Sequence, residues 1–598
     1  MTIAPSMTSG RQVPRLLRLL RRVSLLEVVL YVLLAAIAVV PIVVLVLGSL
    51  TSVSQGFSGT LLAGGATLAN YIELLSSPSF QSALSNTVLT SAIGAIIAML
   101  LGSWLAFLVV RTDIPFKNLT TIVAVVPFFV SAFVHAFAWL VLADPQVGII
   151  NMVFAALDWP MRLNIASLGG VAFVQGLYHA PFVFLFVTAA LSMVDPSLEE
   201  ASRTSGAGVW RMVTRVTLPL VMPAILSAGV LVFALMSGNF AIPSLLGTSA
   251  RLEFITSSIY RMMQFSPPKF GEAATAGVIL MLITFVLYAV QRRYVGKRNY
   301  LSVTGKGFRP RVIKLRGLRW ICTASIFVYA IVVIVIPLGA LLLRSSRPYF
   351  YLAQLSDLWN LALVNWSNYD LLLSYSQVSR ALTNTGLLGV MTAAIGGVLF
   401  FLIAYGAERM SGKGLPVIRY LSTLPAAIPG MVLGLSYLWV ALYLPLPLYG
   451  TIWVLLVAYL ARFTPQGVGS ISSSMRSLHP ELEEGARVAG AGLWLRLRAI
   501  MFPLSRQGIL SAMVLCFVLA VTELHTSILL YTARTTVLSV VMYEFWQSGQ
   551  WGAAAALSII QCLLVVSVLA IAWKVLGISL YPELGNENKK LAKTPTED

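Results

Sequence analysis

The chain has 598 residues, of which 58% are hydrophobic and 11% are charged. Apolar runs long enough to cross a bilayer recur along its length, which excludes a sizeable soluble domain and indicates that lipid surrounds most of the surface. The net charge of +19 does not predict a nucleic-acid partner, because the basic residues lie in short connections between apolar runs.

These runs predict an all-α polytopic membrane protein with about twelve spans. A backbone in lipid must satisfy its own hydrogen bonds, and the runs are too long for barrel strands. The first run is too long for a signal peptide and no small-residue cleavage site follows it, so we expect an uncleaved span. The predicted spans are residues 28–50, 86–110, 120–142, 168–193, 221–247, 273–292, 320–343, 384–405, 420–443, 449–470, 507–531 and 551–575.

Basic residues between the spans predict the orientation. The segment from Gln291 to Trp320 contains ten basic residues and no acidic residue, so we expect it to face the cytoplasm. An even number of spans then places both termini in the cytoplasm. Loops expected on the other side, such as residues 51–81, contain almost no Lys or Arg.

The sequence repeats itself. Ala-Leu-Ser-Asn-Thr beginning at Ala83 recurs as Ala-Leu-Thr-Asn-Thr beginning at Ala381, an offset of 298, and Pro127 recurs as Pro425. Farther along the offset is 284, so the first half has 14 extra residues, which we place around residues 144–167. Both halves begin on the same side of the membrane, which indicates two parallel-repeat six-helix halves. The predicted segments are a cytoplasmic N-terminal segment (1–27), a first half (28–292), a basic cytoplasmic linker (293–319), a second half (320–575) and a cytoplasmic tail (576–598).

Each half carries the same motif before its fifth span. Residues 196–210 and 480–494 align without a gap. Asp195 is expected to cap a helix that begins at Pro196. The pattern predicts a short cytoplasmic helix, an exposed small-residue turn and a second helix that leads back into the membrane. We call each of these segments, residues 196–210 and 480–494, a knob. A knob of this kind can dock in a groove of a partner protein.

Within the first copy, Glu199 and Glu200 lie in the first helical turn, where the helix dipole favours negative charge. Gly206 begins the small-residue turn that breaks the helix, and Pro219 marks where the chain turns into the next span. An ordinary amphipathic connector is the alternative interpretation, but it does not explain the duplication. The equivalent residues of the second copy are Glu483, Glu484, Gly490 and Pro503.

The pattern E-A-A-x(3)-G-x(9)-I-x-L-P resembles the coupling loop of permease subunits of ATP-binding-cassette (ABC) importers. Ser202, Gly485 and Phe502 replace the expected Ala, Ala and Leu. The resemblance implies that a dimer of ABC ATPase subunits binds beneath the two halves. The ATPase-coupling residues that it implies are Glu199, Glu200, Ala201, Gly206, Pro219, Glu483, Glu484, Ala486, Gly490 and Pro503.

We expect no catalytic residue, metal site or cofactor in this chain. It lacks a phosphate-binding G-x(4)-G-K-[ST] motif, so ATP and magnesium are expected in the partner ATPase. Cys322, Cys516 and Cys562 lie in apolar stretches without metal-ligand spacing, which favours packing.

Fusion of two halves and the basic linker around residues 300–310 resemble the ferric-iron permease family. The resemblance implies a bacterial inner-membrane importer for ferric iron that an external or periplasmic substrate-binding protein delivers. Similar fused permeases carry thiamine or 2-aminoethylphosphonate, and these remain alternatives. An ion-coupled secondary transporter is a different class, which the scarcity of carboxylates inside the spans disfavours.

Polar residues inside the spans are candidates for the translocation path, because they are costly in lipid. Asn239 and Glu523 are equivalent at the offset of 284, and His525 lies close to Glu523. The alternative is that they only join helices through hydrogen bonds. A weaker set, which packing explains as well, is His135, Gln175 and His179.

Overall fold

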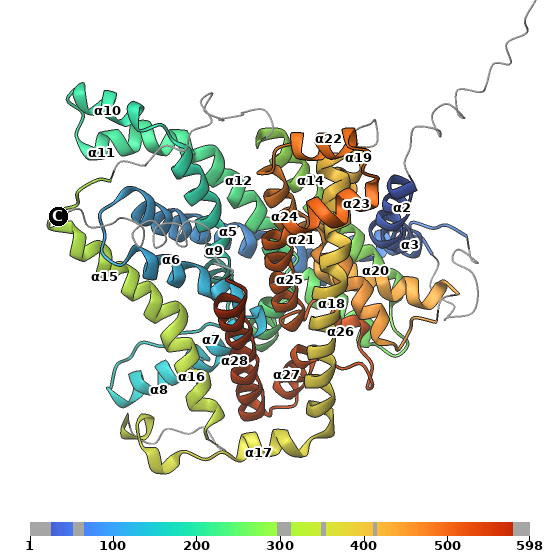
Figure 1. Cartoon of the computed structure of the whole chain (residues 1–598). Coiled ribbons are helices and arrows are strands. Elements are labelled where there is room, and N and C mark those ends of the chain that lie inside the picture. Colours follow the sequence, from blue (N-terminus) through green and yellow to red (C-terminus); the bar gives the residue numbers. More distant parts are fainter. Residues whose placement is uncertain are drawn as a thin grey trace, which may run out of the picture.

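The computed structural model describes residues 25–51, 65–295, 312–347, 355–410, 415–445 and 447–577. The N-terminal arginines, most of the basic linker and nearly all of the C-terminal tail lie outside these ranges. Nine helices in the described ranges are long and apolar enough to cross a membrane, or up to twelve if each of three bent helix pairs is one span. The predicted all-α fold with about twelve spans is confirmed (Figure 1).

The two halves repeat at the predicted offsets. The first half contains α2 (Leu25–Leu34), η1 (Ala35–Val39), α3 (Val40–Ser49), α4 (Ala69–Ser76), α5 (Pro78–Arg111), α6 (Lys117–Val125), η2 (Val126–Phe129), α7 (Ala132–Ala143), α8 (Ile149–Ala156), α9 (Leu168–Met193), α10 (Pro196–Thr204), α11 (Val209–Met212), η3 (Val213–Thr217), α12 (Leu218–Ser237), η4 (Pro243–Gly247), α13 (Ile255–Gln264) and α14 (Phe270–Val295).

The second half contains α15 (Leu318–Ala330), η5 (Ile331–Val335), α16 (Ile336–Ser345), η6 (Leu355–Leu358), η7 (Leu361–Leu363), α17 (Ser367–Ser374), α18 (Ser376–Arg409), α19 (Leu415–Thr423), η8 (Leu424–Ala427), α20 (Gly430–Tyr443), α21 (Ile452–Arg476), α22 (Glu481–Val488), α23 (Leu493–Arg496), η9 (Leu497–Met501), α24 (Phe502–Leu504), α25 (Arg506–Val521), α26 (Ser527–Leu530), α27 (Leu538–Gln547) and α28 (Trp551–Leu576). Helices α5 and α18 both have 34 residues and are offset by 298. Helix α8 lies where we placed the extra residues of the first half.

The halves interlock through their first spans. Helix α3 packs against α14 of its own half and against α20 of the other half, and α16 likewise packs against α28 and against α7. A π-helical turn interrupts each first span, at η1 and at η5. At η1, the hydroxyl of Tyr437 donates a hydrogen bond of 2.7 Å to the carbonyl of Ile37. The predicted halves are therefore repeats in sequence, but neither packs as a separate body.

The third and ninth predicted spans are not straight helices. The segments Lys117–Phe129 and Ala132–Ala143 meet at 98°, and Pro416–Ala427 and Gly430–Tyr443 meet at 106°. The repeated prolines, Pro127 and Pro425, lie in the last turn before each bend, where a missing N–H weakens the helix. Partners then satisfy the freed backbone groups, as where Thr284 of α14 donates to the carbonyl of Ala427 at 2.8 Å.

The repeated Asn-Thr sequence joins each second span to a distant loop. Asn86 donates to the carbonyl of Glu253, and the hydroxyl of Thr87 accepts the amide of Ile255 at 3.1 Å. In the second half, Asn384 donates to the carbonyls of Arg534 and Thr536, and Thr385 accepts the amide of Leu538 at 2.8 Å. These contacts fix the starts of α13 and α27.

The pair α5 and α9 offers a test of this packing. A Cβ added at Gly102 would lie 2.7 Å from the carbonyl oxygen of Ala180 and 2.8 Å from the amide nitrogen of Phe184, whereas nothing lies within 4 Å of a Cβ at Gly386 on α18. Because backbone atoms cannot move aside, we expect Gly102→Ala to cost about 1–3 kcal/mol. Gly386→Ala is the matched control and is expected to be neutral or stabilising by up to about 1 kcal/mol. Thermal unfolding of both purified variants tests the prediction, and equal midpoints would contradict it.

Candidate coupling surfaces and translocation path

The two copies of the knob motif lie at the same end of the molecule. Helices α10 and α11 form one knob and α22 and α23 form the other, whereas α8, α17 and α27 lie at the opposite end (Figure 1). Asp195 accepts the amide of Ser197 at 2.9 Å, as expected for a helix cap. Gly206 and Gly490 have φ of +82° and +81°, a left-handed conformation that favours glycine. The predicted helix, turn and second helix are therefore present in both copies.

Glu199 is not on the exposed face of its knob. It is 3% exposed, and one carboxylate oxygen lies 3.3 Å from Nη1 of Arg111, the last residue of α5. The other oxygen accepts the hydroxyl of Thr217 at 2.9 Å. Arg111 also donates to the carbonyls of Leu191 and Val194, at 2.9 and 3.3 Å. The first turn of α10 is thereby fastened to the ends of α5 and α9.

Glu483 is also buried, at 5% exposed, but it has different partners. Its Oε1 accepts the hydroxyl of Tyr405 on α18 and lies 2.8 Å from Nη1 of Arg496 on α23. Arg409, the repeat equivalent of Arg111, donates to the carbonyls of Met475 and Leu478 and, within the described part of the chain, forms no ion pair with Glu483. The hydrogen bonds from the arginine to carbonyls at the end of the preceding span are thus repeated in both halves. The positive charge that pairs with the glutamate, in contrast, comes from a different helix in each half. The sequence did not predict the contacts of Glu199 with Arg111 and of Glu483 with Tyr405, because these residues are 88 and 78 positions apart.

The prediction that Pro219 marks a turn into the next span is wrong for the first half. Residues Val209–Ser237 form one continuous span, in which the π-helical turn η3 precedes Pro219. In the second half the prediction holds, since Leu493–Leu504 and Arg506–Val521 meet at 74° after Pro503. Ser505 lies at this bend with φ of −91° and ψ of 5°. The two knobs therefore join their spans at different angles.

The fifth and eleventh spans end earlier than predicted. Helix α12 ends at Ser237 and α25 ends at Val521, although the apolar runs continue to residues 247 and 531. Asn239 and Glu523 follow the two ends. The side-chain oxygen of Asn239 accepts the amide of Ile242 at 3.1 Å, and that of Glu523 accepts the amide of Thr526 at 2.8 Å. The two residues thus stabilise equivalent helix breaks, and the predicted equivalence of their positions is confirmed.

Glu523 forms an ion pair inside the membrane-spanning region. Its Oε2 lies 3.0 Å from Nε of Arg462, and the side chains are 6% and 23% exposed. A Cβ at Gly430 would overlap the guanidinium of Arg462, so the close approach of α20 depends on that glycine. His525 lies farther away, with Nδ1 at 3.9 Å from Oε1 of Glu523. Sequence reasoning missed Arg462, although a charge within the predicted span 449–470 was a signal for it.

The histidines of the first half lie beside an aromatic side chain, Tyr178. The rings of His135 and Tyr178 are 5.8 Å apart, and those of Tyr178 and His179 are 4.9 Å apart. In the described part of the chain, the buried Nε2 of His135 and Oε1 of Gln175 have no hydrogen-bond partner.

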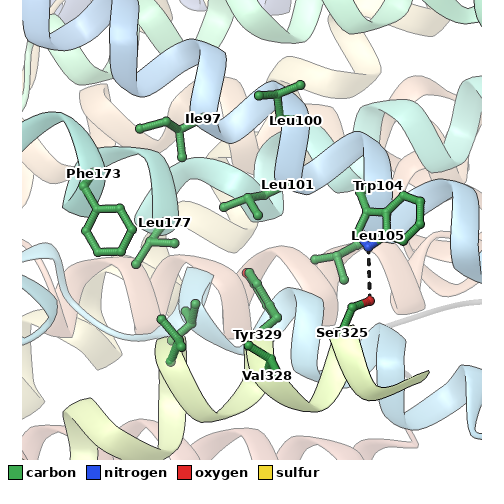
Figure 2. A pocket seen from close by; sticks show the side chains of 12 residues that line it. Ile97, Leu100, Leu101, Trp104, Leu105, Phe173, Leu177, Ser325, Val328 and Tyr329 are labelled. Carbon is green, nitrogen blue, oxygen red and sulfur yellow. Dashed lines mark hydrogen bonds between the residues drawn. The ribbon is translucent and has the colours of Figure 1, made fainter. Parts of the chain in front are cut away.

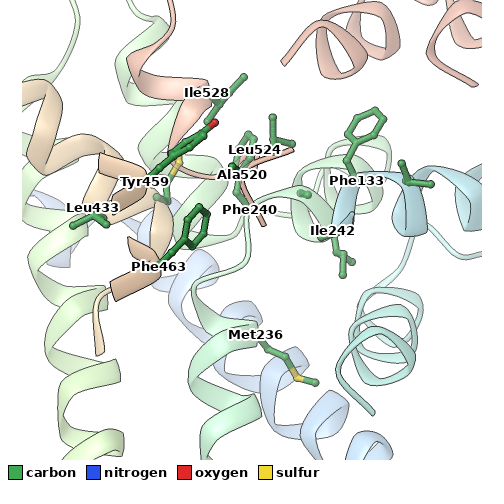
Figure 3. Packing of buried hydrophobic residues seen from close by; sticks show 14 of the residues in the cluster. Phe133, Met236, Phe240, Ile242, Leu433, Tyr459, Phe463, Ala520, Leu524 and Ile528 are labelled. Atoms are coloured by element: carbon green, nitrogen blue, oxygen red, sulfur yellow. The ribbon is translucent and has the colours of Figure 1, made fainter. Parts of the chain in front are cut away.

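Apolar side chains surround this polar cluster. Phe240 packs against Tyr543 of the other half with ring centroids 5.4 Å apart, and the hydroxyl of Tyr543 lies 2.7 Å from that of Ser244. Figure 3 shows core residues of both halves, including Phe133, Phe240, Tyr459 and Leu524. The centre of the molecule is therefore a tightly packed apolar core with a few paired charges. Among the residues that the structure describes, no group of three or more His, Cys, Asp or Glu is arranged to hold a metal ion.

Comparison with known proteins identifies the transport system. Residues 94–299 and 398–576 each match the family described as binding-protein-dependent transport system inner membrane component. The chain belongs to this family. It is a fused permease of an ABC importer, in which both six-helix halves are joined in one polypeptide. It is thus a translocation component, and the secondary-transporter alternative is not supported.

Individual relatives of this permease have been named for their cargo. The chain is 25% identical to the ferric transport system permease protein FbpB of Actinobacillus pleuropneumoniae, over 84% of this chain and 72% of that protein. It is 28% identical to the putative ferric transport system permease protein FbpB 1 of Haemophilus influenzae, over 65% of this chain and 59% of that protein. A putative 2-aminoethylphosphonate permease, PhnV of Salmonella paratyphi A, is 28% identical over 29% of this chain and 68% of that protein.

The contacts of the first knob predict different roles for its two glutamates. Glu199→Gln leaves the buried Arg111 without a counter-charge and is expected to destabilise the permease itself by about 3–5 kcal/mol. Glu200→Gln changes an exposed side chain, where polar contacts contribute little to stability, and is expected to lower the unfolding midpoint much less than Glu199→Gln while weakening ATPase binding. Thermal unfolding of the isolated permease, measured with ATPase binding, tests both expectations. Equal unfolding midpoints for the two variants would contradict the fastening role of Glu199.

The pair Arg462 and Glu523 predicts a rescue. Glu523→Gln can still accept the amide of Thr526, but it leaves Arg462 uncompensated, so we expect membrane abundance to fall. Adding Arg462→Gln removes the orphan charge and should restore abundance. We expect uptake per molecule to stay low in the double variant if the charges serve passage, and Arg534→Gln in an exposed loop is the control. Full uptake by the double variant would show that the pair only joins helices.

Proposed function

We propose that this permease forms the passage of an ATP-driven importer for ferric iron, which an external binding protein delivers. The assignment of ferric iron as the cargo rests on the similarity of this chain to two ferric permeases, one of them over 84% of this chain. The phosphonate permease matches less than a third of the chain, so 2-aminoethylphosphonate is the second candidate. Thiamine has only the resemblance of the fused halves in its favour.

We propose that each knob docks on one subunit of an ATPase dimer. Several of the residues implied by the coupling motif lie on the surface: Glu200, Ala201 and Glu484 are exposed, and Ala486 is half-buried. A Cβ at either Gly206 or Gly490 would meet nothing within 4 Å, so both turns face open space. Buried Glu199 and Glu483 would then not contact the ATPase but would transmit its movement to the spans.

We propose that Asn239, Glu523 and His525 border the passage, together with Arg462. They lie at the helix breaks of the fifth and eleventh spans, where non-helical backbone in a membrane usually lines a cavity or is buried in protein. The carboxylate of Glu523 provides the negative charge that a cation or a positively charged cargo group requires. In the packed state described here, Arg462 neutralises that charge.

We also propose that the knobs and both termini face the cytoplasm of a bacterial inner membrane. The exposed basic residues Lys314 and Arg316 precede α15, and Lys574 lies in the last turn of α28. Basic residues at these span ends favour the cytoplasmic side. The cofactors of transport, ATP and magnesium, would then bind only to the partner ATPase.

Reconstitution tests the proposal. We expect the purified chain in proteoliposomes to hydrolyse no ATP, because it has no phosphate-binding loop. With the partner ATPase, hydrolysis should appear and should rise when the ferric-loaded binding protein is added, but not with the iron-free protein. ATP hydrolysis by the chain alone would contradict the proposal that a separate subunit hydrolyses ATP. If a binding protein loaded with 2-aminoethylphosphonate stimulates ATP hydrolysis and the iron-loaded protein does not, the cargo is 2-aminoethylphosphonate and not ferric iron.

A further inference from the structure

A groove lies between the two halves on the outer surface of the bundle, where Leu100 is 68% and Val328 is 58% exposed. It has a volume of about 510 Å³ and is lined almost entirely by apolar side chains of α5, α9, α15 and η5. Figure 2 shows Leu101 and Leu105 of α5 and Leu177 of α9 facing Tyr329 of α15. At one end, Nε1 of Trp104 donates a hydrogen bond of 3.2 Å to the hydroxyl of Ser325.

The equivalent place in the other half is filled by the chain itself. There α2, the counterpart of α15, packs against α18 and α19. Leu30 and Leu34 of α2 are 2% and 0% exposed, and Leu30 lies so close to Gly406 that a Cβ there would be 2.7 Å from it. The groove beside α15 is therefore not a general consequence of the fold. Because an empty apolar space of this size forfeits dispersion contacts, a molecule from the bilayer is the natural occupant.

Basic residues lie at the same end of α15 as the hydrogen bond between Trp104 and Ser325. Arg319 lies six residues before Ser325, a rise of about 9 Å along a helix. The preceding segment is held against the end of α5, since Ile313 exchanges backbone hydrogen bonds with Arg111 and Asp113. Lys314 and Arg316 in this segment are exposed.

Within the described ranges, the two nearby carboxylates, Asp113 and Glu199, form no ion pair with Lys314, Arg316 or Arg319. Asp113 accepts the amide of Leu315 at 2.8 Å, and Glu199 is occupied by Arg111. The buried Nε of Arg319 has no hydrogen-bond partner in the described ranges. Trp320 is 67% exposed, as is typical of a side chain at the membrane interface.

We propose that the groove binds one acyl chain of an anionic phospholipid, whose phosphate lies beside Lys314, Arg316 and Arg319. The apolar lining accommodates the chain and the basic cluster recognises the headgroup. Since α5 and α9 belong to the first half and α15 to the second, the lipid joins the two halves. This proposal does not depend on the identity of the cargo.

Native mass spectrometry of the full-length permease in detergent tests the proposal. The probes are phosphatidylglycerol and phosphatidylcholine with identical acyl chains. We expect the wild-type protein to retain one phosphatidylglycerol in preference to phosphatidylcholine. One basic residue near a membrane surface contributes about a fivefold factor, so replacing Lys314, Arg316 and Arg319 with Gln should lower phosphatidylglycerol retention at least about fivefold. A control with the same charge change in exposed loops, Arg162→Gln/Arg251→Gln/Arg534→Gln, should retain the lipid.

Filling the groove should abolish retention of either lipid. Leu100→Trp and Val328→Trp act independently at its mouth, where the native side chains are 68% and 58% exposed, so neither disturbs the core. Thermal unfolding identifies a Trp variant that fails to fold. The other Trp variant then provides the test. Equal retention of both lipids by the wild-type protein would overturn the headgroup assignment. Three results would show that a lipid is not the occupant. They are undiminished lipid retention in the Trp variants, retention of detergent alone by the wild-type protein, and co-purification of a peptide that the Trp variants lose.

Discussion

A broken helix in a bilayer must find new partners for every backbone group that the break sets free, because no water replaces them. This constraint explains the placement of four buried polar side chains in the permease. Asn70 donates to the carbonyls that end the first span, and Asn368 does the same in the second half. Asn239 and Glu523 accept amides at the breaks of the fifth and eleventh spans. These four side chains therefore lie where the backbone is irregular, whereas buried Thr and Ser within the continuous helices, such as Thr464 and Ser558, donate to carbonyls of their own helix.

The same requirement acts on charge at the coupling end. A buried carboxylate is tolerated only if it is paired, and the two halves meet this requirement differently. Glu199 pairs with Arg111 at the end of α5, so the first knob is tied to a span. Glu483 pairs with Arg496 within its own knob and reaches α18 only through the hydroxyl of Tyr405. Together with the 74° bend after the second knob, this difference means that the two knobs are connected to their spans in different ways.

At the centre, the ion pair of Arg462 and Glu523 is adjacent to an apolar core rather than to an open channel. Passage of cargo therefore requires the packing between the halves to change. The interlocked first spans bear on this change, because α3 and α16 each contact both halves. A lipid between α5 and α15 would add a third connection whose strength depends on the membrane. Movement of the halves is thus constrained by protein contacts and by lipid at once.

The sequence by itself determined the apolar spans, the parallel repeat, the extra segment of the first half and the two knob motifs, because each depends on local composition or on comparison of two segments. It also predicted the equivalence of Asn239 and Glu523. The bends after Pro127 and Pro425, the burial of Glu199 and the pairing of Arg462 were decided only by the tertiary structure. An apolar run has the same composition whether it is straight or broken, and a charged residue's partner depends on which helices meet. Those meetings join residues such as Arg111 and Glu199, 88 positions apart, which no local pattern connects.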